Sequence, residues 1–223
     1  FERSELLEAD TFPWCPDLEF RRAVVKPELW ESLQVEDYVQ ARYQQSLAEM
    51  PALPGEALWE RRRREVGWLS LNWFMSTLLD RKDRMSMAAG LEVRVPFCDH
   101  HLVEYVWNIP WAMKAMNGQR KQVLRDAAEG LLPEELLRRP KSPYPKTHDP
   151  LYEQLVRARL LTILDDRDAP IHSLVDETAL RAGLLSDAGD YGKPWFGQLM
   201  AGPQMLAYLI QINEWMSRYH LTV

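Results

Sequence analysis

The stretch Ala57–Gly90, ALWERRRREVGWLSLNWFMSTLLDRKDRMSMAAG, decides the fold of this chain. Its first turns, Arg61–Glu65, are polar on most faces, whereas its later turns are apolar nearly all round. A helix that is apolar on every face is normally buried. We therefore expect one long helix that enters from solvent, crosses the interior of the protein and ends at a charged cluster that begins with Asp80.

The flanking segments also carry helix signals. Pro27–Met50 is typical of one or two short helices, and Pro51–Gly55 is a break. Asp99 is placed to cap a helix that begins at His100. Further helices are expected at residues 118–132, 133–139, 151–164, 177–185 and 203–219. Because strand signals are nearly absent, the sequence predicts an all-α fold, arranged as a single helical domain over residues 1–223.

Composition excludes several classes of function. The chain has 223 residues, 46% of them apolar, with a net charge of −6. This charge argues against general nucleic-acid binding, and no segment is apolar enough to span a bilayer, so neither partner is expected. Cys15 and Cys98 lie far apart without metal-ligand spacing, which indicates a reducing, cytoplasmic location. No metal site is expected, because the adjacent His100 and His101 cannot face each other on a helix.

Two stretches carry a specific resemblance. DRMSMAAGLEVRVPFCDHHLVEYVWNIP is followed by GQRKQVLRDAAEGLLPEELLRRPKSPYPKT. They match the pattern R-x-S-M-A-x-G-L-E-x-R-V-P-F-x-D, then G-x-x-K-x-x-L-R, L-P and a loop lysine. Over roughly residues 69–150 the chain resembles the C-terminal part of the synthetase domain in the glutamine-hydrolysing asparagine synthetase family; the first 50 and last 70 residues match less distinctively.

The resemblance implies a reaction in several parts. In this family an N-terminal glutaminase domain with a leading Cys releases ammonia from glutamine. A second domain, similar to adenine-nucleotide α-hydrolases, binds ATP and Mg on a parallel sheet with an S-G-G-x-D-S loop. It adenylates aspartate, and ammonia then displaces AMP to give asparagine. ATP, aspartate and glutamine are the expected substrates, and ATP with Mg the expected cofactors.

The chain departs from this pattern at its start. The sequence begins with Phe1 and not with a Cys, and neither S-G-G-x-D-S nor the family's S-G-E-G-x-D-E motif occurs. By the resemblance, Phe1 falls shortly after the point where the second of these motifs would end. We therefore expect the helical C-terminal part of a synthetase domain, without the sheet and ATP loop, that is inactive alone. The face that packs on the missing sheet should then be exposed and apolar, and a homodimer through such a face is expected.

Lys141 is the candidate catalytic residue. The resemblance assigns it to the family's loop lysine, which contacts the nucleotide phosphates. A positioned cation would stabilise the negative charge that builds on the departing pyrophosphate. The surrounding prolines of RRPKSPYP would restrict the loop. The alternative is a solvated surface lysine, which is the usual state of a lysine in a loop.

The charged cluster has two interpretations. Arg81, Asp83 and Arg84 follow the long helix, and Glu92 and Arg94 lie in GLEVRVPF. They could line the cleft for aspartate and nucleotide, where arginines bind carboxylate or phosphate. They could instead form a paired ionic network that holds the segment in place. The run Arg61–Arg64 is interpreted as a solvated helix face.

Three functions remain open. The leading hypothesis is the C-terminal part of an ATP-dependent, asparagine-forming ligase. A related synthetase that closes a ring by the same adenylation, similar to a β-lactam synthetase, is the alternative within the enzyme class. The third is a stand-alone helical module that binds a partner protein.

Overall fold

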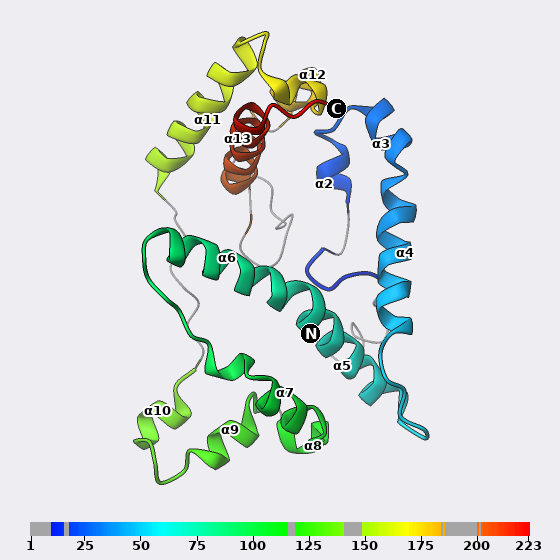
Figure 1. The fold of residues 1–223 in the computed structure, drawn as a ribbon, viewed down its shortest axis with the longest axis vertical. Helices are drawn as coiled ribbons and strands as arrows, with labels where there is room; N and C mark the ends of the chain where they lie inside the picture. Colours follow the sequence, from blue (N-terminus) through cyan, green and yellow to red (C-terminus); the bar gives the residue numbers. More distant parts are fainter. Residues whose placement is uncertain are drawn as a thin grey trace. The chain divides into compact units, whose positions relative to one another are not determined.

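The predicted all-α fold is confirmed by a computed structural model, which describes residues 10–15, 18–115, 119–140, 149–183, 185, 200 and 202–223. Within these ranges the chain is mostly helical and contains no β-sheet (Figure 1). An isolated antiparallel bridge joins Val25 to Val175. The helices form because most segments present apolar stripes at helical spacing, and they end at prolines, glycines and capping residues.

The chain divides into two compact units. Unit 1 comprises Phe1–Ala52 and Pro145–Val223, and unit 2 comprises Leu53–Tyr144. Each unit has its own set of helices. The single helical domain expected from the sequence over residues 1–223 stays a prediction.

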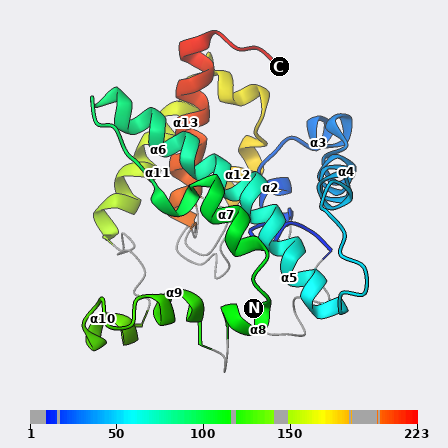
Figure 2. The same ribbon diagram turned by 60° about the horizontal axis from the view of Figure 1, so that its bottom comes forward.

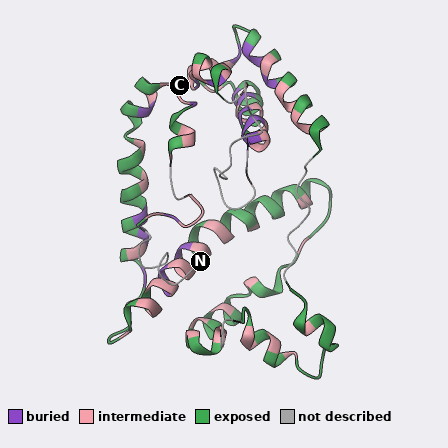
Figure 3. Cartoon of the chain, turned by 180° about the vertical axis from the view of Figure 1, so that it is seen from behind, coloured by how far each residue is buried: buried purple, intermediate pink, exposed green. Residues whose placement is uncertain are grey.

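Unit 1 is built around two long helices that pack against each other, α11 and α13. Its core consists of apolar side chains from these helices and from the segments beside them (Figure 3). Leu160, Leu180 and Leu206 in this core are fully buried. The helices of the unit are α2 (Glu19–Arg22), α3 (Pro27–Leu33), α4 (Val35–Ala48), α11 (Pro150–Asp165), η4 (Pro170–Ser173), α12 (Glu177–Ala182) and α13 (Gly202–Tyr219).

Polar contacts in unit 1 join segments that are far apart in the sequence. The backbone N–H of Asp176 donates to the carbonyl of Val24 at 3.0 Å, beside the Val25 bridge. The backbone N–H of Ile171 donates to Oδ1 of the buried Asn213 at 3.2 Å. These bonds satisfy buried backbone groups outside the helices, as a packed interior requires.

Unit 2 begins with one continuous helical rod formed by α5 (Leu58–Leu69), a π-helical segment η1 (Ser70–Met75) and α6 (Ser76–Ala88) (Figure 1). A loop then leads to shorter helices: η2 (Pro96–Cys98), α7 (His100–Trp107), α8 (Trp111–Lys114), α9 (Gln122–Ala127) and α10 (Glu134–Arg138). The predicted cap of α7 is confirmed, because the Asp99 carboxylate accepts from the N–H groups of His101 and Leu102 at 2.9 and 3.4 Å.

The expectation that the long helix crosses the interior is wrong for its second half. Neither η1 nor α6 has a buried residue (Figure 3). Trp73 is 40% exposed, Leu78 37% and Met85 68%. Apolar side chains favour removal from water, and the sequence pattern shows this preference. The pattern does not specify which surface covers them, so it does not require that they be buried within this unit. The predicted exposed apolar face is therefore confirmed.

The expectation of a solvated face at Arg61–Arg64 is wrong at its last residue. Arg64 is buried, and its Nε lies 2.9 Å from Oε1 of Glu56, whose side chain is 9% exposed. Glu65 is buried as well, and the guanidinium groups of Arg61 and Arg62 donate to it at 3.1 and 2.7 Å. Charges removed from water need such partners, and the sequence run alone could not identify which arginine is buried.

Candidate functional site

The candidate site is a groove of about 530 Å³ in unit 2, lined by residues of the long helical rod and of α7 and α8. Figure 2 shows α7 beside this rod. The volume of the groove falls in the range of sites that bind ligands or partner side chains. The lining is mostly apolar and comes from η1, the start of α6, η2 and α7: Leu71, Phe74, Met75, Leu78, Phe97, Leu102, Val103 and Val106. The π-helical turns of η1 contribute three of these side chains, and such turns are frequent at functional sites.

One end of the groove carries positive charge on aromatic walls. The guanidinium carbon of Arg63 lies 5.4 Å from the ring centre of Trp59 and 5.5 Å from that of Trp111. Nζ of Lys114 lies 5.2 Å from the same Trp111 ring and donates to the carbonyl of Trp107 at 3.3 Å. Cations placed over tryptophan faces are attracted by the ring quadrupole, so the indoles hold these two cations at the groove.

The electrostatics at this end are unbalanced. Burial lowers the pKa of Lys114, and the nearby positive charge of Arg64 lowers it further. In the described part of unit 2, the ion pairs include Arg64 with Glu56, but they do not include Arg63 or Lys114. An anion bound at this end would relieve the repulsion that acts on the Lys114 amine.

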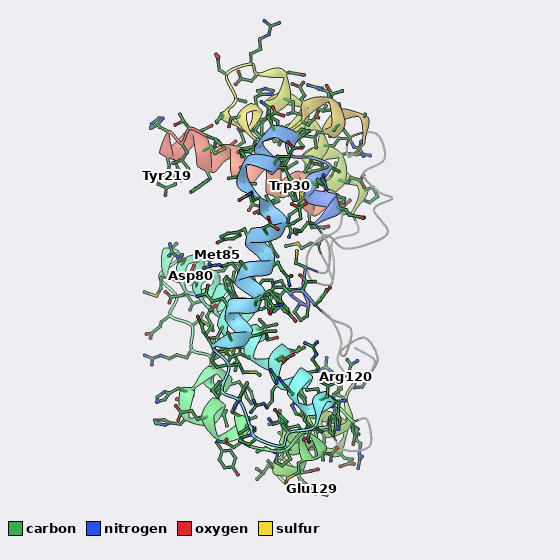
Figure 4. The ribbon with its side chains drawn as sticks, turned by 90° about the vertical axis from the view of Figure 1, so that its right-hand side faces the viewer. Trp30, Asp80, Met85, Arg120, Glu129 and Tyr219 are labelled. Carbon is green, nitrogen blue, oxygen red and sulfur yellow. The ribbon has the colours of Figure 1, made fainter. Side chains whose placement is uncertain are left out.

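The residues expected on α6 are all exposed. Nε of Arg84 donates to Oδ1 of Asp80 one turn earlier at 2.8 Å, and both side chains are largely in solvent (Figure 4). This bond raises the pKa of the Arg84 guanidinium. Arg81 and Asp83 are exposed on the same helix. These exposed charges lie in the part of α6 that follows Leu78, the last residue of the rod that lines the groove. An anionic ligand can reach them from solvent.

Glu92 and Arg94 form a pair of their own. Nη2 of Arg94 lies 2.6 Å from Oε1 of Glu92. The two side chains are 65% and 82% exposed, so the pair is solvated. In the described part of the chain, this ion pair and the Asp80–Arg84 pair each join residues of one segment. No hydrogen bond or ion pair between described residues joins Arg81, Asp83 or Arg84 to Glu92 or Arg94.

Lys141, the candidate catalytic residue, lies outside the described residues. Its assignment therefore stays a prediction. Arg139 and Pro140, which precede it, are described, and Nη2 of Arg125 donates to the carbonyl of Arg139 at 3.4 Å. This bond connects α9, which carries part of the second sequence motif, to the segment that leads into the lysine loop.

Sequence reasoning missed the groove end formed by Arg63, Lys114, Trp107 and Trp111. Arg63 was interpreted as part of a solvated run. The available signal was the basic run beside Trp59, combined with two tryptophans and a lysine at positions 107, 111 and 114. The packing of α7 and α8 against α5 brings these residues together.

A search of the described residues found no group of three or more His, Cys, Asp or Glu side chains that could hold a metal ion. Among these same residues, no helix has the length and apolar character needed to cross a membrane. Cys15 and Cys98 are both partly buried, and they form no disulfide with each other.

Comparison with known proteins gives a consistent result. A family model described as asparagine synthase matches residues 1–217. The chain is 48% identical over 212 residues to the glutamine-hydrolyzing asparagine synthetase 3 of Bacillus subtilis (strain 168), covering 95% of this chain and 34% of that protein. It is 42% identical over 73 residues to asparagine synthetase 1 of the same organism, which is 33% of this chain and 12% of the relative. It is also 43% identical over 67 residues to the glutamine-hydrolyzing asparagine synthetase of Homo sapiens. This match covers 29% of this chain and 12% of that protein. The chain thus spans about a third of the length of the relative that it matches throughout.

Proposed function

Because this chain belongs to the asparagine synthase family, we propose that it supplies the C-terminal helical part of an ATP-dependent, amide-forming synthetase that makes asparagine. The family match over residues 1–217 is the observation that carries the proposal. In the proposed reaction an oxygen of the aspartate side-chain carboxylate attacks the α-phosphorus of ATP, and pyrophosphate leaves. Ammonia from glutamine then attacks the activated acyl carbon, and AMP leaves with the bonding electrons.

The described residues fit only part of this chemistry. They offer no cluster of acidic ligands that would hold Mg, so we assign the Mg and most of the ATP contacts to parts of the protein outside these residues. Within the chain, Arg81 and Arg84 are exposed cations that can bind carboxylate or phosphate oxygens. Arg84 is partly neutralised by Asp80, which leaves Arg81 as the better candidate for an anionic substrate. Asp83, Glu92 and Arg94 would shape the same charged wall.

Lys141 is proposed to contact the pyrophosphate that leaves during adenylation. Its ammonium group would stabilise charge that exists only as the phosphorus–oxygen bond breaks. The proposal includes a cytoplasmic location and small-molecule substrates, namely aspartate, glutamine and ATP. It also includes the inactivity of the chain by itself, because two thirds of the length of the full-length relative is not represented in it.

The test uses a joined protein, in which this chain replaces the 212 matched residues of the Bacillus subtilis relative. We expect it to release pyrophosphate and form asparagine with ATP, aspartate and glutamine, whereas this chain alone does neither. Substitution Lys141→Ala should lower the rate of asparagine formation about 10²-fold or more, the size found when one transition-state contact is removed. The matched control is Lys82→Ala, at an exposed lysine of α6. Pyrophosphate release by the chain alone, or an unchanged rate in Lys141→Ala, would contradict the proposal.

A second candidate function is a helical module that binds a partner protein. It is favoured by one observation, the exposed apolar groove in unit 2. This alternative predicts that Lys141→Ala leaves function intact. The ring-closing synthetase remains an alternative within the enzyme class. Identifying the product of the joined protein tests this alternative, because asparagine formation supports the leading proposal.

A further inference from the structure

The groove in unit 2 has the exposed apolar lining of an interaction surface. Its lining residues include exposed large apolar side chains, among them Leu78, Phe97, Leu102 and Val106, which are 37–67% exposed. A contiguous apolar patch of this kind is uncommon on a protein that acts as a monomer, and it marks sites where another surface is buried. The groove also lies between helices, which is the geometry that accepts an amphipathic helical segment.

The charged end defines the chemistry of the occupant. Arg63 and Lys114 both lie against the Trp111 ring, and neither has an acidic partner among the described residues. Arg64, the third cation of the lining, is already paired with Glu56. Two cations held in place without a counter-charge favour a carboxylate.

The Trp111 indole gives a second, independent observation. Its Nε1 is buried and has no hydrogen-bond acceptor in the described part of the chain. A buried donor without an acceptor costs free energy, and such groups in proteins are nearly always satisfied when the partner is present. An occupant that brings an oxygen to this end would satisfy the indole and the two cations together. The lowered pKa of Lys114 has the same origin, because the amine is desolvated without a compensating negative charge.

The length of the relatives indicates where the occupant comes from. The chain corresponds to 34% of the Bacillus subtilis relative, so about two thirds of that polypeptide has no counterpart here. A partner that belongs to the same functional protein is present at a high effective concentration, which favours it over a separate ligand. A second copy of this chain would bring the same cations to the interface, where like charges repel unless they are paired.

We propose that the groove binds an amphipathic segment from the remaining two thirds of the asparagine synthase polypeptide, with apolar side chains along the groove and an Asp or Glu at Arg63 and Lys114. The inference rests on the proposed function for the source of the segment. The chemistry of the segment rests on the groove itself.

The experiment measures the acetylation rate of the Lys114 amine in this chain alone and in the joined protein, each normalised to the urea-unfolded state. We expect the rate to fall several-fold in the joined protein, because the occupant covers the amine. Lys114→Glu should lower the Tm of the joined protein by several degrees, but should not lower the Tm of this chain alone, where it removes a desolvated amine that Arg64 repels. Lys114→Arg should retain the Tm, since it keeps the charge. Arg120→Glu is the matched control, because Arg120 is an exposed cation of unit 2 that does not line the groove (Figure 4).

The outcomes separate this inference from the proposed function. Equal acetylation rates in the two proteins would overturn the inference, even if the joined protein makes asparagine. Protection of Lys114 in a joined protein that makes no asparagine would support the inference and contradict the function. If Lys114 is protected from acetylation but Lys114→Glu and Arg120→Glu change the Tm of the joined protein equally, the proposed Asp or Glu of the occupant beside Lys114 is refuted. Protection in this chain alone that grows with its concentration would assign the groove to a second copy, which also overturns the inference. Should the joined protein not fold, this chain mixed with the separately produced remainder is labelled instead, and unprotected Lys114 there counts against the inference.

Discussion

Replacing Asn213 with Leu tests whether one buried hydrogen bond holds α13 to η4. Oδ1 of Asn213 accepts from the backbone N–H of Ile171 at 3.2 Å, and both residues are buried. Leucine has the same branched arrangement of heavy atoms as asparagine, so Asn213→Leu keeps the shape of the side chain and removes the Oδ1 acceptor together with the Nδ2 amide. The N–H of Ile171 is then left buried without a partner, which costs about 1–3 kcal/mol of unfolding free energy. In a chain of this size 1 kcal/mol corresponds to about 2–4 °C, so the Tm should fall by several degrees.

The assay is urea denaturation followed by circular dichroism, together with hydrogen exchange of the Ile171 amide. We expect a lower midpoint with an unchanged slope, and faster exchange at Ile171. The matched control is Asn108→Leu, at an exposed cap of α7 whose Nδ2 donates to a backbone carbonyl at 2.9 Å. This control should change the unfolding free energy by no more than about 0.5 kcal/mol. An Asn213→Leu variant as stable as the parent would refute the reasoning, because leucine packing would then outweigh the lost bond.

Three further predictions concern single side chains. Leu160 is fully buried, so Leu160→Ala should lower the unfolding free energy measured by urea denaturation by about 2–5 kcal/mol. Leu155→Ala, on the exposed face of the same helix, should lower it little. Equal losses of unfolding free energy in the two variants would contradict the assigned core. Asp99→Ala removes the cap of α7 and should lower the unfolding free energy by about 1 kcal/mol in the same assay. Asp99→Asn should keep most of the stabilisation by the cap. An Asp99→Ala variant with the unfolding free energy of the parent would show that the cap does not stabilise the protein. Because burial and the charge of Arg64 lower the pKa of Lys114, the charged amine costs stability below that lowered pKa, and the cost disappears as pH rises to the ordinary value of 10.5. The advantage of Lys114→Gln over the parent should therefore shrink between neutral pH and pH 10.5 in urea denaturation, and an advantage that grows with pH would contradict the assigned cause.

The helical content was predictable because helix signals are local. Asp99 before an apolar run, the prolines at 110 and 150, and the stripe of α13 each act within a few residues, and the observed helices begin and end near the predicted positions. The family motifs are local in the same sense, since each is a short pattern of residues. Agreement between the predicted and observed helix bounds was poorest at 118–132. Among the described residues of this range, the α-helix covers only Gln122–Ala127.

The candidate site was predictable only in part. The sequence placed Arg84 and Arg94 in charged segments, and the structure shows both in solvent-exposed pairs with Asp80 and Glu92. It did not predict that Arg63 and Lys114 meet at one tryptophan, because they lie about fifty residues apart and their approach depends on how α8 packs. Pairwise contacts at such separation carry no local signal.

By itself, the sequence determined the helices, their caps and the family. Those properties follow from backbone hydrogen bonding and short motifs, which a few neighbouring residues specify. Tertiary structure alone decided that Arg64 is buried, that Asn213 serves the backbone of η4, and that the apolar half of the long helix lies open as a groove. The physical reason is that burial depends on which surfaces meet, and a stripe of apolar residues specifies its preference for contact but not its partner.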